Sequence, residues 1–261
     1  TKYLRQIGFT FSQSYIEATL TKNADIAKLL IDLFLARFNP TSQQNVADTT
    51  DAHIKQIDQL LEKVSSLDED RILRKFLEVI LATLRTSYFQ KNDNHEHKSY
   101  LSFKFDPARI ADLPLPRPKY EIFVCSPRVE GLHLRASQVA RGGLRWSDRR
   151  EDYRTEVLGL MKAQQVKNTV IVPEGAKGGF IVKMPQAPEM SRDDYMKEVV
   201  NCYSTFIAGM LDITDNIKEG VVVPPLDVVR FDGDDPYLVV AADKGTATFS
   251  NIANRSEERR V

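Results

Sequence analysis

The stretch "VIVPEGAKGGFIVK", residues 170–183, decides how the second half of this chain folds. Two runs of apolar, mostly β-branched residues flank a segment that holds three glycines and one lysine, Lys177. Short apolar runs bounded by glycine and proline are typical of buried strands. Glycines also let the backbone approach a ligand closely. We therefore predict that Lys177 lies between two strands in a partly buried position.

A lysine in such a position has a specific chemical use. Burial disfavours the charged form of its ammonium group, and a neutral amine can act as a general base. The alternative is a glycine-rich hairpin with an exposed lysine. A phosphate-binding P-loop is excluded, because that loop needs Gly-Lys-Ser/Thr at the start of a helix.

Composition limits the class of protein. The 261 residues are 42% hydrophobic and 28% charged, and the formal net charge is zero. These values are ordinary for a globular chain and argue against bulk attraction to nucleic acid. The sequence contains no run of 18 or more apolar residues, so it predicts no membrane span. Two cysteines, Cys125 and Cys202, are too few for a disulfide framework, which favours the cytoplasm. The chain starts at Thr1, and we interpret that start as a cut, made either by processing or because the chain is a piece of a longer protein.

The predicted fold class is α/β, with an N-terminal helical segment followed by a mixed sheet layered with helices. In residues 1–98, apolar residues recur every three or four positions, as in amphipathic helices. From residue 99 onward, strand-like runs alternate with two helical segments that start at the capping candidates Ser147 and Ser191. We expect strands at about 101–105, 120–126, 130–137, 169–172, 180–183, 220–225 and 237–243, and helices at about 147–167 and 191–211.

Two polar segments have simple interpretations. His95 and His97 lie in the polar loop "QKNDNHEHK" without a cysteine or third ligand nearby, so we predict no metal site. Arg149, Arg150 and Arg154 alternate with acidic residues. This pattern favours a salt-bridged helix face over a phosphate or nucleic-acid site.

A second glycine motif precedes the first. In "ARGGLRWSD", residues 140–148, Arg141 stands before a glycine pair, and the intervening helix ends at Lys167 in "LMKAQQVKN". Two cations beside glycine pairs, joined by a helix that adds a third, can converge on one pocket. A dicarboxylate suits such a pocket, because arginine offers bidentate contacts and lysine a point charge.

The combination of "RGGLRW", "QQVKN" and "GAKGG" resembles the glutamate dehydrogenases, and the wording around it resembles their large NAD-specific bacterial class. The resemblance covers the chain to about Asn254 and is most specific over residues 119–183. It implies the substrate domain of these enzymes. It also implies L-glutamate and 2-oxoglutarate as ligands, NAD as cofactor and a homo-oligomeric parent protein.

The resemblance also implies catalytic residues. Lys177 matches the lysine that activates the water attacking the iminium intermediate. Asp243 in "VVAADKGTATFSN" matches the aspartate that relays a proton to or from the substrate nitrogen, although Ala242 replaces a glycine of the family pattern. The alternative is that Asp243 only caps the helix after Thr246.

Substrate-binding residues follow in the same way. Lys167 matches the lysine that holds the α-carboxylate. Arg141 stands before Gly142 and Gly143 where smaller family members have a lysine for the γ-carboxylate. Together with Lys177 and Asp243, these cations are expected to line one cleft.

No dinucleotide fingerprint G-x-G-x-x-G occurs in the sequence. We therefore interpret the chain as the substrate-binding part of a dehydrogenase whose NAD-binding domain is absent from it. The predicted division is a helical segment at 1–98, the substrate-binding domain at 99–254 and an unassigned charged tail at 255–261. The alternative is a non-catalytic module that binds a dicarboxylate or mediates oligomerisation.

Overall fold

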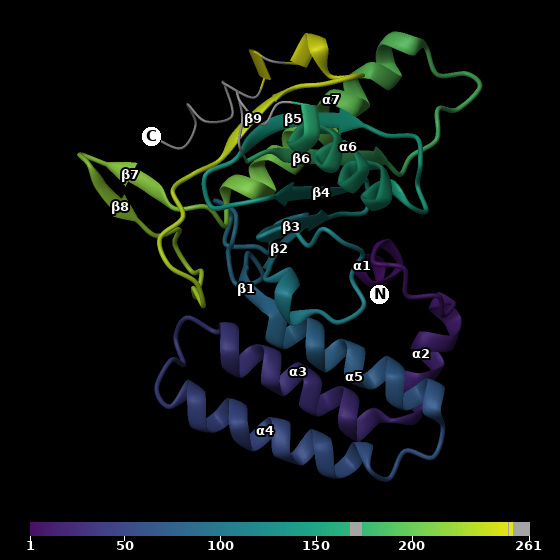
Figure 1. Cartoon of the computed structure of the whole chain (residues 1–261), viewed down its shortest axis with the longest axis vertical. Coiled ribbons are helices and arrows are strands. Elements are labelled where there is room, and N and C mark those ends of the chain that lie inside the picture. Colours follow the sequence, from purple (N-terminus) through teal and green to yellow (C-terminus); the bar gives the residue numbers. More distant parts are fainter. Residues whose placement is uncertain (168–173, 250, 253–261) are drawn as a thin grey trace.

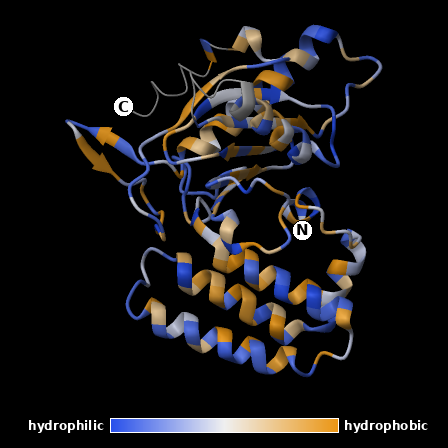
Figure 2. Cartoon of the chain, viewed as in Figure 1, coloured by the Kyte–Doolittle hydropathy of each residue, from blue (hydrophilic) through white to orange (hydrophobic). Residues whose placement is uncertain are grey.

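Helices form the first third of the chain, in a computed structural model that describes residues 1–167, 174–249 and 251–252. Leu33 of the third helix is fully buried against Ile57 and Leu73 of the next two, and polar faces alternate with these apolar stripes (Figure 2). Ser66 begins the fifth helix by accepting a hydrogen bond from the backbone of Glu69. The helices are α1 Lys2–Gln6, α2 Gln13–Lys22, α3 Ala24–Phe38, α4 Val46–Leu61 and α5 Leu67–Ala82.

A seven-stranded mixed sheet follows, with the strand order β1-β2-β3-β4-β6-β5-β9. Neighbouring strands from β1 to β6 are antiparallel, whereas β5 runs parallel to both β6 and β9. The predicted fold class is confirmed. The strands are β1 Thr83–Thr86, β2 Leu101–Phe105, β3 Tyr120–Cys125, β4 Val129–Arg135, β5 Arg141–Trp146, β6 Ala176–Val182 and β9 Val239–Ala242.

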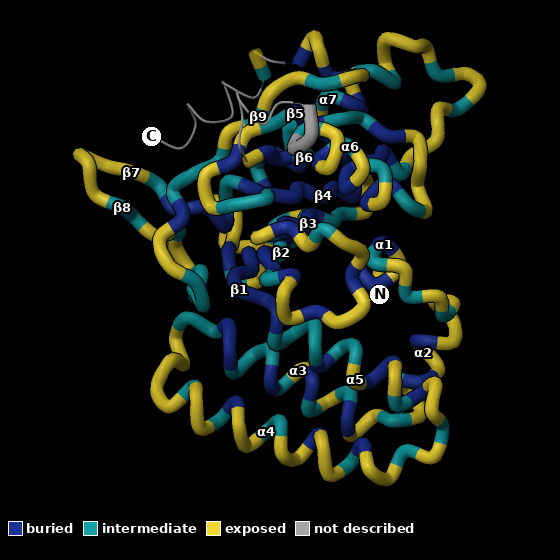
Figure 3. Tube along the Cα trace, in the orientation of Figure 1, coloured by how far each residue is buried: buried dark blue, intermediate teal, exposed yellow. Residues whose placement is uncertain are grey.

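Helices α6 (Tyr153–Lys167) and α7 (Arg192–Leu211) cover opposite faces of the sheet (Figure 1). A Cβ at Gly131 of β4 would meet the ring of Phe206 on α7. A Cβ at Gly179 of β6, on the other face, would meet Val157 on α6. The central strands β4 and β6 are therefore buried along nearly their whole length (Figure 3).

The remaining described elements lie at the edges. The layer formed by α3, α4 and α5 lies next to the β1 edge of the sheet (Figure 1). A two-stranded sheet extends from the segment between α7 and β9 (Figure 1). None of the described helices is both long and apolar enough to cross a membrane. The elements are β7 Asn216–Lys218, β8 Val221–Val223, η1 Pro107–Arg109 and η2 Ala247–Phe249.

Several expected boundaries need correction. Helix α6 begins at Tyr153 and not at Ser147. The Ser147 hydroxyl donates to the Glu156 side chain instead of capping the helix. The Arg154 amide in the first turn donates to the side chain of Gln6 on α1. Strands β1 and β5 were not expected from the sequence. Strand β1 extends the sheet into the segment assigned to helices, whereas Ser191 caps α7 as predicted. The strand expected at 169–172 and the tail at 255–261 lie outside the described residues. The division into domains stays a prediction.

Candidate functional site

Lys177 is the second residue of β6, with β4 on one side and β5 on the other. It is paired with Leu134 across the antiparallel ladder, and its side chain points to the face that α6 covers. Only 19% of that side chain is exposed. The expected place between two strands and the alternative of an exposed hairpin turn are therefore both wrong, because Lys177 lies within an interior strand; its partly buried state is as predicted.

The Lys177 ammonium contacts the Asp243 carboxylate. The distance from Nζ to Oδ2 is 2.5 Å, and 15% of the Asp243 side chain is exposed. Asp243 directly follows β9, on the far side of β5 from β6. Two residues that lie 66 positions apart thus form a half-buried ion pair across one strand. The sequence analysis named both as the catalytic residues.

The electrostatics of Asp243 favour its carboxylate form. Burial opposes ionisation, but the hydrogen bond from Lys177, the Lys244 backbone amide and the charges of Lys177 and Arg145 together hold its pKa below the usual range. Oδ1 accepts the Lys244 amide at 2.6 Å. Thr246, and not Asp243, organises the turn that follows, since its hydroxyl accepts from the Asp243 amide and donates to the Leu144 carbonyl.

The glycine pair of β5 allows this contact sterically. A Cβ at Gly142 would lie 1.5 Å from the carbonyl oxygen of Ala176 on β6. A Cβ at Gly143 would lie 2.8 Å from the Cβ of Asp243. Side chains at these two positions would push β6 and Asp243 away from β5. Both glycines are thus required for the local backbone packing, whatever their role toward a ligand.

In the described part of the structure, Arg145 and Glu156 add two further charged side chains to this site, and neither was expected there from the sequence. The Arg145 guanidinium donates to Glu156 on α6 through Nη1 at 2.8 Å, and its Nη2 lies 3.8 Å from Asp243 Oδ1. Ser147 donates to the second Glu156 oxygen at 2.6 Å. One signal was available: in a strand, Gly143 and Arg145 project to the same face.

Arg141 and Lys167 were expected to join the same cleft. Arg141 is exposed at the start of β5, and it forms no salt bridge with any described residue. Its carbonyl accepts a hydrogen bond from Gln164 of α6 at 3.1 Å. Helix α6 ends at Lys167, whose side chain lies outside the described part of the structure. The geometry therefore brings together two of the four expected charged groups, Lys177 and Asp243.

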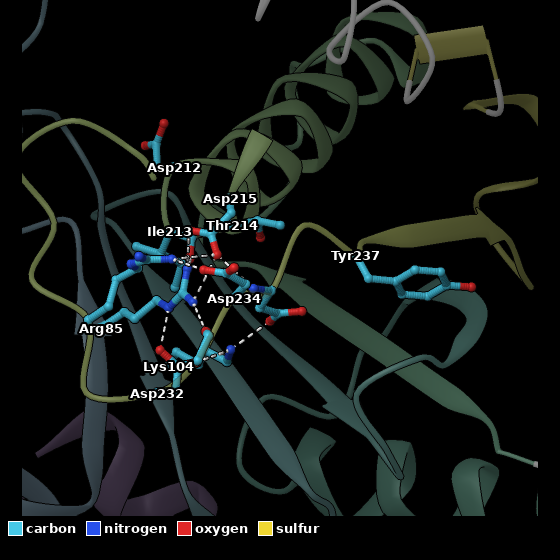
Figure 4. A network of polar contacts seen from close by, with 12 residues as sticks. Arg85, Lys104, Asp212, Ile213, Thr214, Asp215, Asp232, Asp234 and Tyr237 are labelled. Atoms are coloured by element: carbon cyan, nitrogen blue, oxygen red, sulfur yellow. Dashed lines mark hydrogen bonds and ion pairs between the residues drawn. The ribbon is translucent and has the colours of Figure 1, made fainter. Parts of the chain in front are cut away.

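A cluster of buried charges fixes the segment that leads to β9. Arg85 of β1 is fully buried and bonds Asp215 at 2.8 Å and Asp232 at 2.6 Å (Figure 4). Lys104 of β2 bonds Asp232 at 2.5 Å and Asp235 at 2.6 Å. Arg135 of β4 adds a salt bridge to Asp235. We call these six residues the buried charge cluster: Arg85, Lys104, Arg135, Asp215, Asp232 and Asp235.

The cluster is electrically balanced, with three cations and three carboxylates. Arg135 also donates to the Tyr237 carbonyl at 2.7 Å, two residues before β9. Asp243 therefore reaches Lys177 from a strand whose approach is fixed by strands β1, β2 and β4. Among the described residues, no group of three or more His, Cys, Asp or Glu side chains is placed to hold a metal ion.

Two known protein families match parts of this chain. Residues 56–260 match the family described as bacterial NAD-glutamate dehydrogenase, catalytic domain. The chain belongs to this family. Residues 1–40 match glutamate dehydrogenase, helical motif 3. The resemblance drawn from the motifs around Lys177 is confirmed, and the chain forms part of such a catalytic domain.

Individual relatives are much longer than this chain. It is 58% identical over 257 residues to the NAD-specific glutamate dehydrogenase of Pseudomonas aeruginosa and 56% identical over 254 residues to that of Halomonas elongata. Each match covers 97% of this chain but 16% of the relative. The NAD-specific glutamate dehydrogenase of Mycobacterium tuberculosis is 55% identical over 265 residues. The chain thus spans about one sixth of the length of these curated relatives.

Proposed function

We propose that this chain is the substrate-binding part of an NAD-dependent glutamate dehydrogenase. The whole enzyme converts L-glutamate, NAD and water to 2-oxoglutarate, ammonia and NADH. The observation that carries the proposal is the half-buried pair of Lys177 and Asp243 beside the glycine pair of β5, in a chain of this family. A cation and a carboxylate in contact provide a donor and an acceptor for the proton transfers of this reaction.

The binding roles are assigned as follows. Arg141 and Lys167 hold the two substrate carboxylates as charge-assisted partners. Gly142 and Gly143 contribute to the substrate site through their backbone, and their lack of a side chain lets β6 and Asp243 pack closely beside it. NAD is held by a domain outside this chain, because the sequence contains no G-x-G-x-x-G turn. When it is bound, its nicotinamide accepts the hydride from the substrate Cα.

The proton transfers are assigned to the ion pair. Asp243, held ionised, accepts a proton from the substrate ammonium group, so that the free amine can release hydride from Cα. Loss of hydride leaves an iminium cation next to Lys177, and Lys177, whose side chain is 19% exposed, releases its ammonium proton to solvent. Lys177 then takes a proton from the water that attacks Cα. Asp243 returns its proton to the nitrogen, the hydroxyl proton of the intermediate passes to solvent, the C–N bond breaks as the ketone forms, and ammonia leaves.

The proposal extends to the setting of the whole protein. We propose that it is a cytoplasmic homo-oligomer that binds neither nucleic acid nor a membrane. Free Cys125 and Cys202 support a reducing compartment. Arg149 and Arg154 are paired with Asp152 and Glu121, which favours a structural role for these arginines over a nucleic-acid site. Light scattering on the full-length protein tests the oligomeric state.

The test of the proposed function is Lys177→Ala in the full-length dehydrogenase. Turnover of glutamate at saturating NAD should fall by about 10²- to 10⁴-fold, because a general base is lost from the chemical steps. The KM for glutamate should change little, since other cations hold the carboxylates. Steady-state formation of NADH measures both quantities.

The matched control is Lys197→Ala, which removes an exposed lysine of α7 that is paired only with Asp194 among the described residues. Its kinetics should equal those of the unaltered enzyme. If Lys177→Ala raises KM and leaves kcat unchanged, Lys177 is a carboxylate ligand and the base must be sought at Asp243. If the unaltered full-length dehydrogenase forms no NADH from glutamate, the non-catalytic alternative replaces the proposal.

A further inference from the structure

Arg145 lies between the pair of Lys177 and Asp243 on one side and helix α6 on the other. On β5 it stands level with Gly179 and points to the same sheet face as Lys177. One nitrogen, Nη1, donates to Glu156 at 2.8 Å, while Nη2 lies 3.8 Å from Asp243 Oδ1. The guanidinium is thus shared between two carboxylates, and 21% of the side chain is exposed.

The Glu156 side of this arrangement is firmly held. Glu156 lies in the first turn of α6, and its second oxygen accepts the Ser147 hydroxyl at 2.6 Å. Burial opposes ionisation of Glu156, but the hydrogen bonds from Ser147 and Arg145 and the charges of Arg145 and Arg149 hold its pKa below the usual range. An ionised Glu156 therefore fixes the orientation of the planar guanidinium.

The Asp243 side is a charge contact without a direct hydrogen bond. At 3.8 Å, the Coulomb attraction remains strong in a partly buried site, while Asp243 Oδ1 stays free to accept the Lys244 amide. Among the described side chains, the charged groups that face Asp243 are Lys177 from β6 and Arg145 from β5, with Glu156 of α6 behind Arg145. Arg145 thus opposes protonation of Asp243 from the side that Lys177 does not reach.

We propose that Arg145 is a positioning residue that keeps Asp243 ionised and aimed at Lys177, with Glu156 and Ser147 fixing Arg145 in turn. The role of Arg145 in catalysis depends on the proposed function of the Lys177–Asp243 pair. Its electrostatic effect can be measured without any turnover. Two separate readouts therefore distinguish a failure of this inference from a failure of the proposed function.

The first readout is the titration of the Asp243 carboxyl group, followed by carbon NMR on the chain labelled at its aspartate carboxyls. Arg145→Met should move the midpoint of this titration to higher pH by about one unit, because an opposite charge within 4–6 Å is lost. Arg145→Lys keeps the charge and should restore most of the shift. Arg149→Met is the matched control, since that arginine is exposed and pairs with Asp152.

A second variant separates charge from orientation. Glu156→Gln removes the anchor and its negative charge but leaves the Arg145 cation. The Asp243 midpoint should then stay at or below that of the unaltered chain, so this variant carries the test even if Arg145→Met does not fold. An unmoved midpoint in Arg145→Met, or equal midpoints in Arg145→Met and Arg145→Lys, would overturn the inference.

The second readout is the pH profile of kcat/KM for glutamate in the full-length dehydrogenase. An ionised Asp243 is needed, so activity falls on the acid side as this group gains a proton. Arg145→Met should move that acid limb to higher pH by the same amount as the NMR midpoint, and Arg145→Lys should return it. A moved midpoint with an unmoved acid limb would mean that Asp243 is not the proton acceptor, which refutes the proposed function alone.

Discussion

Gly142 and Gly143 differ from the other described glycines because a backbone oxygen of a neighbouring strand lies 1.5 Å (Ala176) or 2.8 Å (Ala242) from the position of an added Cβ. At Gly142 the obstacle is the backbone of Ala176, which cannot rotate away as a side chain can. At Gly143 the obstacles are the carbonyl oxygen of Ala242 and the side chain of Asp243. Gly159 on α6 is the opposite case, with no atom within 4 Å of the added carbon. The three positions therefore separate packing effects from effects on the site.

An alanine series at these positions tests that distinction. Gly142→Ala should abolish folding or lower the free energy of unfolding by several kcal/mol, beyond the roughly 1–3 kcal/mol typical of overpacking. Gly143→Ala should displace Asp243 and reduce turnover more than stability. Gly159→Ala should be neutral or stabilise by up to about 1 kcal/mol, since alanine favours helix. Urea denaturation of the chain and turnover of the full-length enzyme measure the two effects.

If Gly142→Ala folds with unchanged stability, β5 and β6 can move apart, and the close approach of Gly142 to Ala176 is not a requirement. If Gly143→Ala leaves turnover intact, the position of Asp243 over β5 has no catalytic consequence.

At the scale of elements, the buried charge cluster fixes β9 to the rest of the sheet. Burial opposes ionisation of Asp215 and Asp235, but the pKa of both lies below the usual range. Arg85, the Asp235 amide and Arg230 lower it for Asp215, and Arg135 and Lys104 lower it for Asp235. A carboxyl group with a lowered pKa in the folded state contributes stability above its unfolded value, near pH 3.8, and this contribution is lost as the pH falls below that value.

Asp235→Asn tests the cluster. At pH 7 the free energy of unfolding should fall by about 3–5 kcal/mol, because Lys104 and Arg135 lose a buried partner charge. The acid loss of stability below about pH 3.8 should also become shallower, since one titrating carboxyl group is gone. Urea denaturation at pH 7 and pH 3 measures both. Asp234→Asn, a neighbouring exposed carboxylate, should change stability by less than about 0.5 kcal/mol.

Most elements were predictable where an apolar period was clear, as in α3, α7, β3 and β4. Strand β1 was missed because Leu84 continues the helical spacing of α5. Strand β5 was missed because its two glycines and two arginines hide the alternation of a strand, and its pairing with β6 and β9 provides the stabilisation. Tertiary contacts overrode local propensity in both cases.

The site was only partly predictable. The motifs pointed to Lys177 and Asp243, but no local pattern indicates that residues 66 positions apart form an ion pair. The signal for Arg145, its projection to the same face as Gly143, depends on a strand that was not expected, and Glu156 carried no signal beyond its charge. The buried charge cluster was not anticipated, because six scattered charged residues resemble a solvated surface in sequence. Pairing across separate elements, which a sequence does not show, is what allows their burial.

At the scale of the whole molecule, the proposed function gives this chain the substrate side of a reaction that needs two ligands. Hydride transfer requires the nicotinamide to be held against the substrate Cα. Without a dinucleotide-binding unit, this chain alone should form no NADH from glutamate above a heat-inactivated control. The full-length dehydrogenase should do so under the same conditions.

Calorimetry tests the same division of ligands by measuring the binding of NAD and of 2-oxoglutarate to the isolated chain. Titration of the isolated chain with NAD should give no heat of binding. Titration with 2-oxoglutarate should give weak binding that Arg141→Ala reduces further. Binding of NAD by this chain would contradict the assignment of the cofactor to another domain.

The order in which the ribosome delivers the chain has a consequence for the pair across β5. Lys177 is synthesised 66 residues before Asp243, and β9 is the last strand of the sheet. At typical elongation rates of 5–20 residues per second, Lys177 waits about 3–13 s for its partner. During that interval β5 is an open edge, able to pair with another nascent strand. Completion of the candidate site and closure of this aggregation-prone edge are therefore the same event.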